Sequence, residues 1–334
     1  MKKSEKIAII VAVILVVAGL VITSLAFRAL GSAEWGIEIS GIETNETHVS
    51  IGTAEMITNT HSIGKTFDSI NIHTDVAYVN FELAKDGACK VVCEEYEQDK
   101  HEVFVENGTL TVRKQSAGQE YIPFGISAEH QNITVYLPQE SYENLLISTD
   151  TGKVVVPEFL AFGNAEVSTD TGYIDFFAAV SGSLSIRSDT GRVTAQNIEP
   201  KSLNISTDTG DISLKNIRIS GDAAIRTDTG DTEMVSVKCR GLKMESHTGD
   251  IVLEKVIASA AADMRTDTGD INLKGFDAEA IYIRTDTGEV MGTILSEKVF
   301  LVESNTGDID VPKTISGGRC EITTDTGDIT IEIA

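Results

Sequence analysis

Cysteine, histidine, proline and tryptophan are all scarce in this chain of 334 residues, which has four, six, five and one of them. Cys89 and Cys93 occupy one strand-like run, so their Cα atoms would be about 13 Å apart, too far for a disulfide. No cysteine is spaced with a histidine as zinc ligands are, and the scattered histidines form no catalytic group. We therefore expect Cys89, Cys93, Cys239 and Cys320 to be buried or partly buried free thiols.

Positive charge is also scarce. The chain has 27 Lys and Arg residues against 51 Asp and Glu, for a net charge of −24. So acidic a surface repels nucleic acid and anionic lipid, which excludes nucleic acid as a partner, and it attracts cations. With few prolines and 41% apolar residues, the composition indicates a β-rich globular chain rather than a disordered one.

One long uncharged run, Ile7–Phe27, stands near the N-terminus. As a helix it would span about 30 Å, the thickness of a bilayer core. Three lysines precede it and one arginine follows, which predicts a cytoplasmic N-terminus and an extracytoplasmic body. A cleaved signal peptide ending at Ala26 is the alternative, but its apolar run is usually shorter. We predict that residues 1–28 are a single-pass anchor in the bacterial cytoplasmic membrane.

A T-D-T-G motif recurs at steps of 19 or 20 residues through the second half of the chain. So even a period is the signature of a solenoid or a propeller, and a propeller blade needs about twice this length. The ten glycines of the motif are Gly152, Gly172, Gly191, Gly210, Gly230, Gly249, Gly269, Gly288, Gly307 and Gly327.

Each repeat is a set of short strands. In the unit 211–230, apolar residues alternate at Ile212 and Leu214 and again at Ile217 and Ile219. Such alternation predicts strands with one inward face, and three of them leave no room for a helix. The predicted fold is an all-β, single-stranded β-solenoid of about ten coils over residues 146–334, with rungs about 4.8 Å apart.

Two further segments precede the repeats. Residues 29–65 are expected to be a linker that contains at most one strand. Residues 66–145 are expected to be a β region that caps the solenoid, because an open end exposes unpaired strand edges. Within it, Thr74-Asp75 marks a degenerate first coil, Asn107-Gly108 marks a hairpin, and residues 115–130 form a surface loop.

The repeated corner has its own chemistry. Glycine adopts positive φ freely, and aspartate hydrogen-bonds a backbone N–H two residues on, so the motif predicts a structural turn. Carboxylates stacked about 5 Å apart repel by roughly 1–3 kcal/mol per pair, and bound Ca²⁺ is one way to offset that. The spacing matches no known calcium loop, so no metal or cofactor is expected, with Ca²⁺ as the alternative. The candidate ligands would be Asp208, Asp211, Asp228, Asp231, Asp267 and Asp270.

A charged column lies two residues before the corner aspartate. Stacking in chain order would place Glu245 between Arg226 and Arg265, and Glu303 beside Arg284, as a register device. D-T-G also occurs in aspartic proteases, but their dyad needs two loops that face each other, which stacked corners do not provide. No catalytic residues are therefore expected.

The chain resembles a bacterial adhesin-type β-strand-repeat family, domain of unknown function 4097. The resemblance covers about residues 66–334. It is carried by F-x-x-I-x-I from Phe67, G-x-L-x-V from Gly108, I-x-V-x-L-P from Ile133 and the serial T-D-T-G-D-I corners. It implies a tether to a bacterial membrane and, for some relatives, a link to envelope stress. It implies no established activity and no catalytic residues.

The expected function is that of a membrane-anchored, extracytoplasmic, non-enzymatic interaction, adhesion or scaffold protein of the cell envelope. Its partner would be an envelope protein or glycan. The alternative is a polysaccharide lyase or hydrolase on a parallel β-helix, whose polyanionic substrate this acidic surface would repel. The last strand, at Ile329–Ile333, is expected to expose an edge at the tip of the solenoid for an end-to-end contact or a partner's strand.

Overall fold

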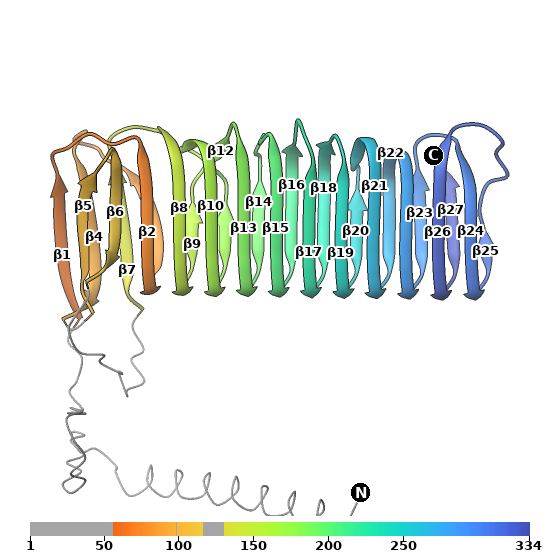
Figure 1. The fold of residues 1–334 in the computed structure, drawn as a ribbon, viewed down its shortest axis with the longest axis horizontal. Helices are drawn as coiled ribbons and strands as arrows, with labels where there is room; N and C mark the ends of the chain where they lie inside the picture. Colours follow the sequence, from red (N-terminus) through yellow and green to blue (C-terminus); the bar gives the residue numbers. More distant parts are fainter. Residues whose placement is uncertain (1–55, 98, 116–129) are drawn as a thin grey trace, which may run out of the picture. The chain divides into compact units, whose positions relative to one another are not determined.

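The computed structural model describes residues 56–97, 99–115 and 130–334, and all of its regular structure is β-strand. The 27 strands are joined in one continuous sheet that winds into a solenoid, and the T-D-T-G repeats form its successive coils (Figure 1). The prediction of an all-β solenoid of about ten coils is thus confirmed. Among the described residues no helix is long and apolar enough to cross a membrane, and the predicted anchor at residues 7–27 lies outside them.

Two long faces run the length of the solenoid. In order of pairing, the first face contains β5 (His101–Glu106), β6 (Thr109–Lys114), β2 (Ser69–Val76), β8 (Ser141–Thr151), β10 (Ala161–Thr171), β13 (Ser183–Thr190), β15 (Ser202–Thr209), β17 (Ala223–Thr229), β19 (Leu242–Thr248), β21 (Ile257–Thr268), β22 (Ile271–Thr287), β26 (Gly318–Thr326) and β24 (Lys298–Thr306). Apart from the antiparallel pair β5 and β6, all neighbours on this face are parallel.

The second face contains β1 (Met56–Ile63), β4 (Cys89–Tyr96), β7 (Asn132–Leu137), β3 (Tyr78–Leu83), β9 (Val154–Val156), β11 (Ile174–Phe176), β14 (Val193–Gln196), β16 (Ile212–Arg218), β18 (Thr232–Cys239), β20 (Ile251–Glu254), the first residues of β22, β23 (Val290–Ile294), β27 (Ile329–Ile333) and β25 (Ile309–Asp310). A short extra strand, β12 (Ala179–Val180), pairs with the start of β10.

The core fills the space between the two faces. Inward positions alternate with outward ones along most strands, as in β15, where Leu203, Ile205 and Thr207 are buried. Burial of such side chains contributes about 25 cal/mol per Å² of apolar surface. The alternation seen in the sequence therefore corresponds to real inward and outward rows.

The corner glycines are required by stacking as well as by conformation. Gly230 has φ of 140°, and a Cβ added there would lie 2.6 Å from the carbonyl carbon of Gly210 in the preceding coil and closer still to its oxygen. Each corner packs against the next, backbone to backbone. A positive φ was expected at this position, but the close approach of neighbouring coils was not.

Coil order at the N-terminal end differs from chain order. β2 pairs with β8 so that Thr74 lies beside Thr149, as a degenerate first coil should. However, β6 and β7, which follow in the sequence, lie outside β2 and β3. Beyond them, β5 and β4 add antiparallel strands, and β1, from the end of the predicted linker, pairs with β4.

Coil order at the C-terminal end also departs from chain order, and here it corrects two expectations. β26 lies between β22 and β24, and β27 lies between β23 and β25 (Figure 1). The last strand, Ile329–Ile333, is therefore not the outermost strand: Ile329 and Thr330 are paired on both sides, whereas Ile331–Ile333 pair with β23 alone. Glu303 is likewise separated from Arg284 by Thr323.

The inward side chains of β26 and of the coil that contains β24 account for this order. Cys320, Ile322 and Thr324 on β26 are all buried, which suits a position with neighbours on both sides. The outermost coil, which we call the terminal coil, consists of β24 and β25 (residues 298–310). Its inward row begins with the buried Lys298, whose Nζ lies 2.7 Å from Asp277 Oδ1 on β22.

Candidate functional site

The corner aspartates that were candidate calcium ligands lie on the outer surface, either exposed or half-buried. Asp228 accepts from Arg226, two residues earlier on the same strand, at 2.8 Å, and its Oδ1 lies 3.2 Å from His247 Nδ1. Asp267 is paired with Arg265 in the same way. Glu245 lies between Arg226 and Arg265, as predicted, and bonds Arg226 at 3.2 Å, which confirms the charge pairing on that side.

The aspartates that follow the glycine form a ladder between coils. Asp211 Oδ1 accepts the backbone N–H of Asp231 at 3.0 Å, and Asp231 Oδ1 accepts that of Asp250 at 2.9 Å. Asp250 and Asp270 continue the ladder. Backbone N–H groups thus offset part of the charge of these carboxylates. Each donating N–H belongs to the next coil, not to the turn of the aspartate that accepts it.

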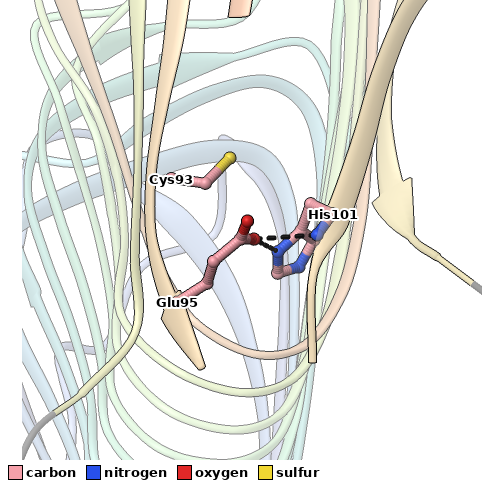
Figure 2. Close-up of side chains that lie close together, drawn as sticks. All are labelled: Cys93, Glu95 and His101. Carbon is pink, nitrogen blue, oxygen red and sulfur yellow. Dashed lines mark hydrogen bonds and ion pairs between the residues drawn. The ribbon is translucent and has the colours of Figure 1, made fainter. Parts of the chain in front are cut away.

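A different set of residues forms a buried cluster between the two faces at the N-terminal end. Within the described ranges, one group of at least three His, Cys, Asp or Glu residues has ligand atoms all within 4.8 Å of one another, and it consists of Cys93, Glu95 and His101. Cys93 and Glu95 are inward residues of β4, and His101 begins β5 (Figure 2). The side chains of Glu95 and His101 are 0% and 2% exposed.

Hydrogen bonds hold the carboxylate of Glu95 on both oxygens. Its Oε2 accepts from the backbone N–H of His101 at 2.8 Å and lies 2.7 Å from His101 Nδ1. Its Oε1 accepts from Asn59 Nδ2, on β1, at 2.6 Å. Burial by itself acts to raise the pKa of Glu95, but these hydrogen bonds more than offset it, so the pKa lies below its usual value. Glu95 is therefore a buried, ionised carboxylate.

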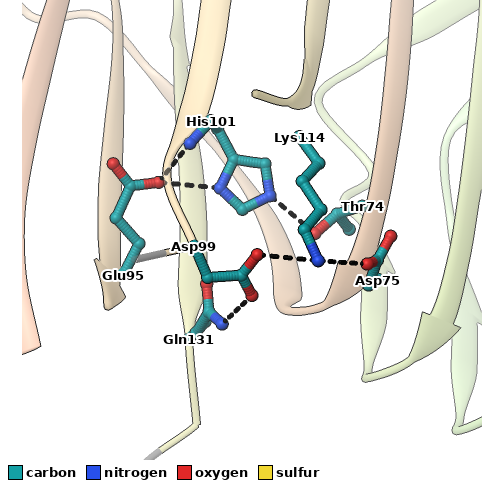
Figure 3. A network of polar contacts seen from close by, with 7 residues as sticks. All are labelled: Thr74, Asp75, Glu95, Asp99, His101, Lys114 and Gln131. Atoms are coloured by element: carbon teal, nitrogen blue, oxygen red, sulfur yellow. Dashed lines mark hydrogen bonds and ion pairs between the residues drawn. The ribbon is translucent and has the colours of Figure 1, made fainter. Parts of the chain in front are cut away.

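The imidazole of His101 also terminates a column of buried hydroxyls. Along the first face, each coil places one inward Thr or Ser in this column, and most of them donate to a glycine carbonyl of the neighbouring coil, as Thr227 does to Gly210 at 3.4 Å. Thr74 is the member of this column nearest the N-terminal end, and its Oγ1 lies 2.7 Å from His101 Nε2 (Figure 3). Both ring nitrogens thus have a partner.

An outer layer of charge covers this cluster. Lys114 Nζ lies 2.5 Å from Asp75 Oδ2 and 2.9 Å from Asp99 Oδ1, and Gln131 donates to Asp99 Oδ2 at 2.9 Å (Figure 3). Burial acts to raise the pKa of Asp99, but the hydrogen bonds from Lys114 and Gln131 lower it overall. The charges of Lys114, Asp75 and Asp99 are therefore paired with one another.

The thiol of Cys93 is not a nucleophile in this setting. Burial, with the charge of Glu95 second, raises its pKa to about 12, so almost none of it is thiolate at neutral pH. The four cysteines are all free and buried, as expected from the sequence.

Sequence reasoning missed this cluster because its members lie on two strands separated by a turn. One signal was available: the inward row of β4 is Cys89, Val91, Cys93 and Glu95. An acidic residue in a row that is otherwise apolar requires a buried partner.

A second feature lies at the opposite end, on the terminal coil. β24 pairs with β26 on one side, and no other described strand pairs with it. Its outward residues Val299 and Leu301 are 37% and 49% exposed, and Ile309 on β25 is 45% exposed. This coil therefore combines an unpaired edge with apolar side chains.

Three solved structures illustrate the likeness of this chain to known proteins. A putative adhesin from Parabacteroides distasonis ATCC 8503 has a TM-score of 0.49 at 11% identity, covering 84% of this chain and 98% of that one. A putative lipid binding protein from the same strain has 0.41 at 15% identity, with the same coverage. A putative cell adhesion protein from Clostridium sporogenes ATCC 15579 has 0.22 at 10% identity, covering 84% and 100%. Values this low support no functional conclusion.

No curated protein matches the chain. The model of the family described as Toastrack DUF4097 matches residues 67–231 and 220–334, which include the repeats and the strands before them. The resemblance found in the sequence is thereby confirmed. The chain belongs to the Toastrack DUF4097 family.

Proposed function

We propose that this chain is a membrane-anchored, extracytoplasmic, non-enzymatic solenoid that serves as an interaction, adhesion or scaffold protein of the bacterial cell envelope. The terminal coil supports the proposal, because in the described solenoid it combines an unpaired strand edge with exposed apolar side chains. The family resemblance adds the expectation of a link to envelope stress.

The terminal coil offers two attractions to a partner. The free edge of β24 presents unpaired backbone N–H and C=O groups, which recruit an additional strand. Val299 and Leu301 beside it are apolar and exposed, and such groups mark contact sites when they gather in one place. Glu303, Asp308 and Asp310 flank them, which favours a partner with a basic rim over a polyanionic glycan.

An enzyme acting on polysaccharides is less well supported. Two histidines of the described residues lie close to a carboxylate. His101 and Glu95 are buried beneath the salt bridges of Lys114, and His247 and Asp228 lie on the outer surface, where Asp228 is already paired with Arg226. A polymeric substrate needs an open groove lined by such groups. The acidic outer rows would also repel a polyanion.

The experiment alters the terminal coil and compares it with a control variant that carries the same change in net charge elsewhere on the solenoid. Val299→Glu with Leu301→Glu should reduce cross-linking of the chain to its envelope partner several-fold in intact cells, because charge is placed in an apolar contact. The matched control is Leu146→Glu with Tyr282→Glu, two residues that are similarly exposed on interior strands. Equal capture by both variants and the parent would show that the terminal coil is a solvated end.

A further inference from the structure

We propose that Cys93, Glu95 and His101 form a site for a divalent cation of the zinc class. The three side chains converge from β4 and β5 into one buried space between the faces, with their ligand atoms within 4.8 Å of one another (Figure 2). All three residues are buried.

The donor set matches zinc. Thiolate, imidazole and carboxylate are the three side-chain ligands of Zn²⁺, at about 2.0–2.3 Å from the ion. Donor atoms around a tetrahedral ion therefore lie roughly 3.5 Å apart. Glu95 Oε2 and His101 Nδ1 are closer than that, at 2.7 Å, so binding requires this pair to separate and the Cys93 thiol, within 4.8 Å of both, to approach the ion. Calcium is disfavoured, because it takes oxygen ligands.

Charge balance favours the same occupant. One thiolate and one carboxylate neutralise the two charges of the ion, so the occupied site is neutral as a whole. A neutral set of groups is far easier to bury than an unpaired charge. Binding releases the proton of the Cys93 thiol to solvent, and His101 ligates through Nδ1 once that nitrogen carries no proton.

The surrounding contacts hold the ligands in position for an ion. Thr74 Oγ1 is 2.7 Å from His101 Nε2, and this contact orients the ring with Nδ1 directed toward Glu95 (Figure 3). Asn59 holds Oε1 of Glu95, and the backbone N–H of His101 holds Oε2. Hydrogen bonds of this kind orient metal ligands and fix the tautomer of a ligating histidine.

Cobalt and zinc titration of the purified chain tests the site. The chain is first stripped with chelator, and titration is done with excess Mg²⁺ present to occupy the exposed aspartates. We expect one Co²⁺ per chain, a near-ultraviolet thiolate-to-cobalt band, and loss of that band when Zn²⁺ is added. Cys93→Ser should abolish the band, whereas Cys89→Ser should keep it. Cys89 is a matched control, since it is a free, buried thiol on the same strand.

X-ray absorption at the zinc edge of the parent chain gives a readout that needs no variant. A sulfur shell at about 2.3 Å supports the site, whereas oxygen and nitrogen neighbours alone overturn it. The absence of a band in the parent, or an equal band in Cys93→Ser, would also overturn it. In that case the cluster is a hydrogen-bonded end of the threonine column. The proposal stands apart from the interaction function, since it concerns the opposite end of the solenoid.

Discussion

At the scale of single residues, the corner of each coil is governed by the approach of one backbone to the next. Gly230 illustrates it: its φ is 140°, and the carbonyl of Gly210 occupies the place where a Cβ would project. Asp228, two residues away, points outward to Arg226 and His247. The two residues of the same motif therefore differ in how replaceable they are.

Gly230→Val should lower the free energy of unfolding by at least about 1–3 kcal/mol, since a β-branched residue at positive φ is strained even before the overlap is counted. Asp228→Asn should cost less than about 1 kcal/mol, because exposed ion pairs contribute little. Urea unfolding followed by circular dichroism measures both. Equal losses in the two variants would mean that the aspartate has a role beyond the turn.

The ladder of aspartates makes a second prediction. Asp250→Ala removes the acceptor of the Asp270 N–H, at a cost of up to about 1 kcal/mol because water replaces it in part. Asp250→Asn keeps an acceptor oxygen and removes a repelling charge, so it should be as stable as the parent or slightly more so. If thermal melting showed Asp250→Asn to be less stable than the parent and Asp250→Ala to be as stable as the parent, the role of the ladder would be contradicted.

At the scale of elements, the order of coils differs from the order of the chain at both ends. β6 and β7 lie outside β2 and β3 at one end, and the terminal coil lies outside β26 and β27 at the other. Repeat proteins fray from their ends, because a terminal repeat has a neighbour on one side only. Here the start of β27, Ile329 and Thr330, is also paired with β25, so it is released only after the terminal coil has moved.

Disulfide trapping distinguishes this order from a sequential one. Tyr282 and Glu321 are neighbours on adjacent strands, at about 4.8 Å in a sheet, so the pair Tyr282→Cys and Glu321→Cys should oxidise readily. Tyr282 and Leu301 are two strands apart, at about 9.6 Å, so Tyr282→Cys with Leu301→Cys should not. Mass spectrometry of tryptic digests reads out both. A bridge in the second pair alone would restore the sequential order.

At the scale of the whole molecule, the net charge of −24 is spread along regular outer rows. Part of it is already offset, by arginines two residues before the corner aspartates and by backbone N–H groups along the ladder. These contacts offset part of the repulsion between stacked carboxylates without a bound ion.

Calcium at millimolar concentration should raise the melting temperature only as much as sodium chloride of equal ionic strength does. A specific shift of more than about 10 °C would show that calcium is bound tightly by the folded state. Such a result would support the alternative in which calcium is bound by the candidate ligands Asp208, Asp211, Asp228, Asp231, Asp267 and Asp270.

The predicted membrane anchor can be tested by the accessibility of the repeats to protease. If Ile7–Phe27 holds the chain with its N-terminus inside, protease added to intact cells or protoplasts should digest the repeats while a cytoplasmic control protein survives. The full-length chain should also remain with the membrane after a high-salt wash. A mature N-terminus near Ala26, or a protected body, would count against the anchor.

Local features of the chain were predictable and most of the candidate site was not. The alternation at Ile212 and Leu214 indicates inward rows, and the buried free state of Cys93 follows from spacing alone. His101 and Glu95 could not be paired from the sequence, because their contact depends on which face each strand joins. The exposed edge was assigned to Ile329–Ile333 because coils were taken to stack in chain order.

What the sequence determined by itself is the coil: a period of 19 or 20 residues, one glycine per corner and two inward rows. These are short-range properties, set by backbone conformation and by the alternation of apolar side chains. Only the tertiary structure decided which coil lies beside which. The reason is that all coils have nearly the same backbone edges and similar apolar inward side chains, so many neighbours would fit. The choice depends on the particular side chains at each end, such as Lys298 with Asp277 and His101 with Thr74, which meet only once the chain has folded.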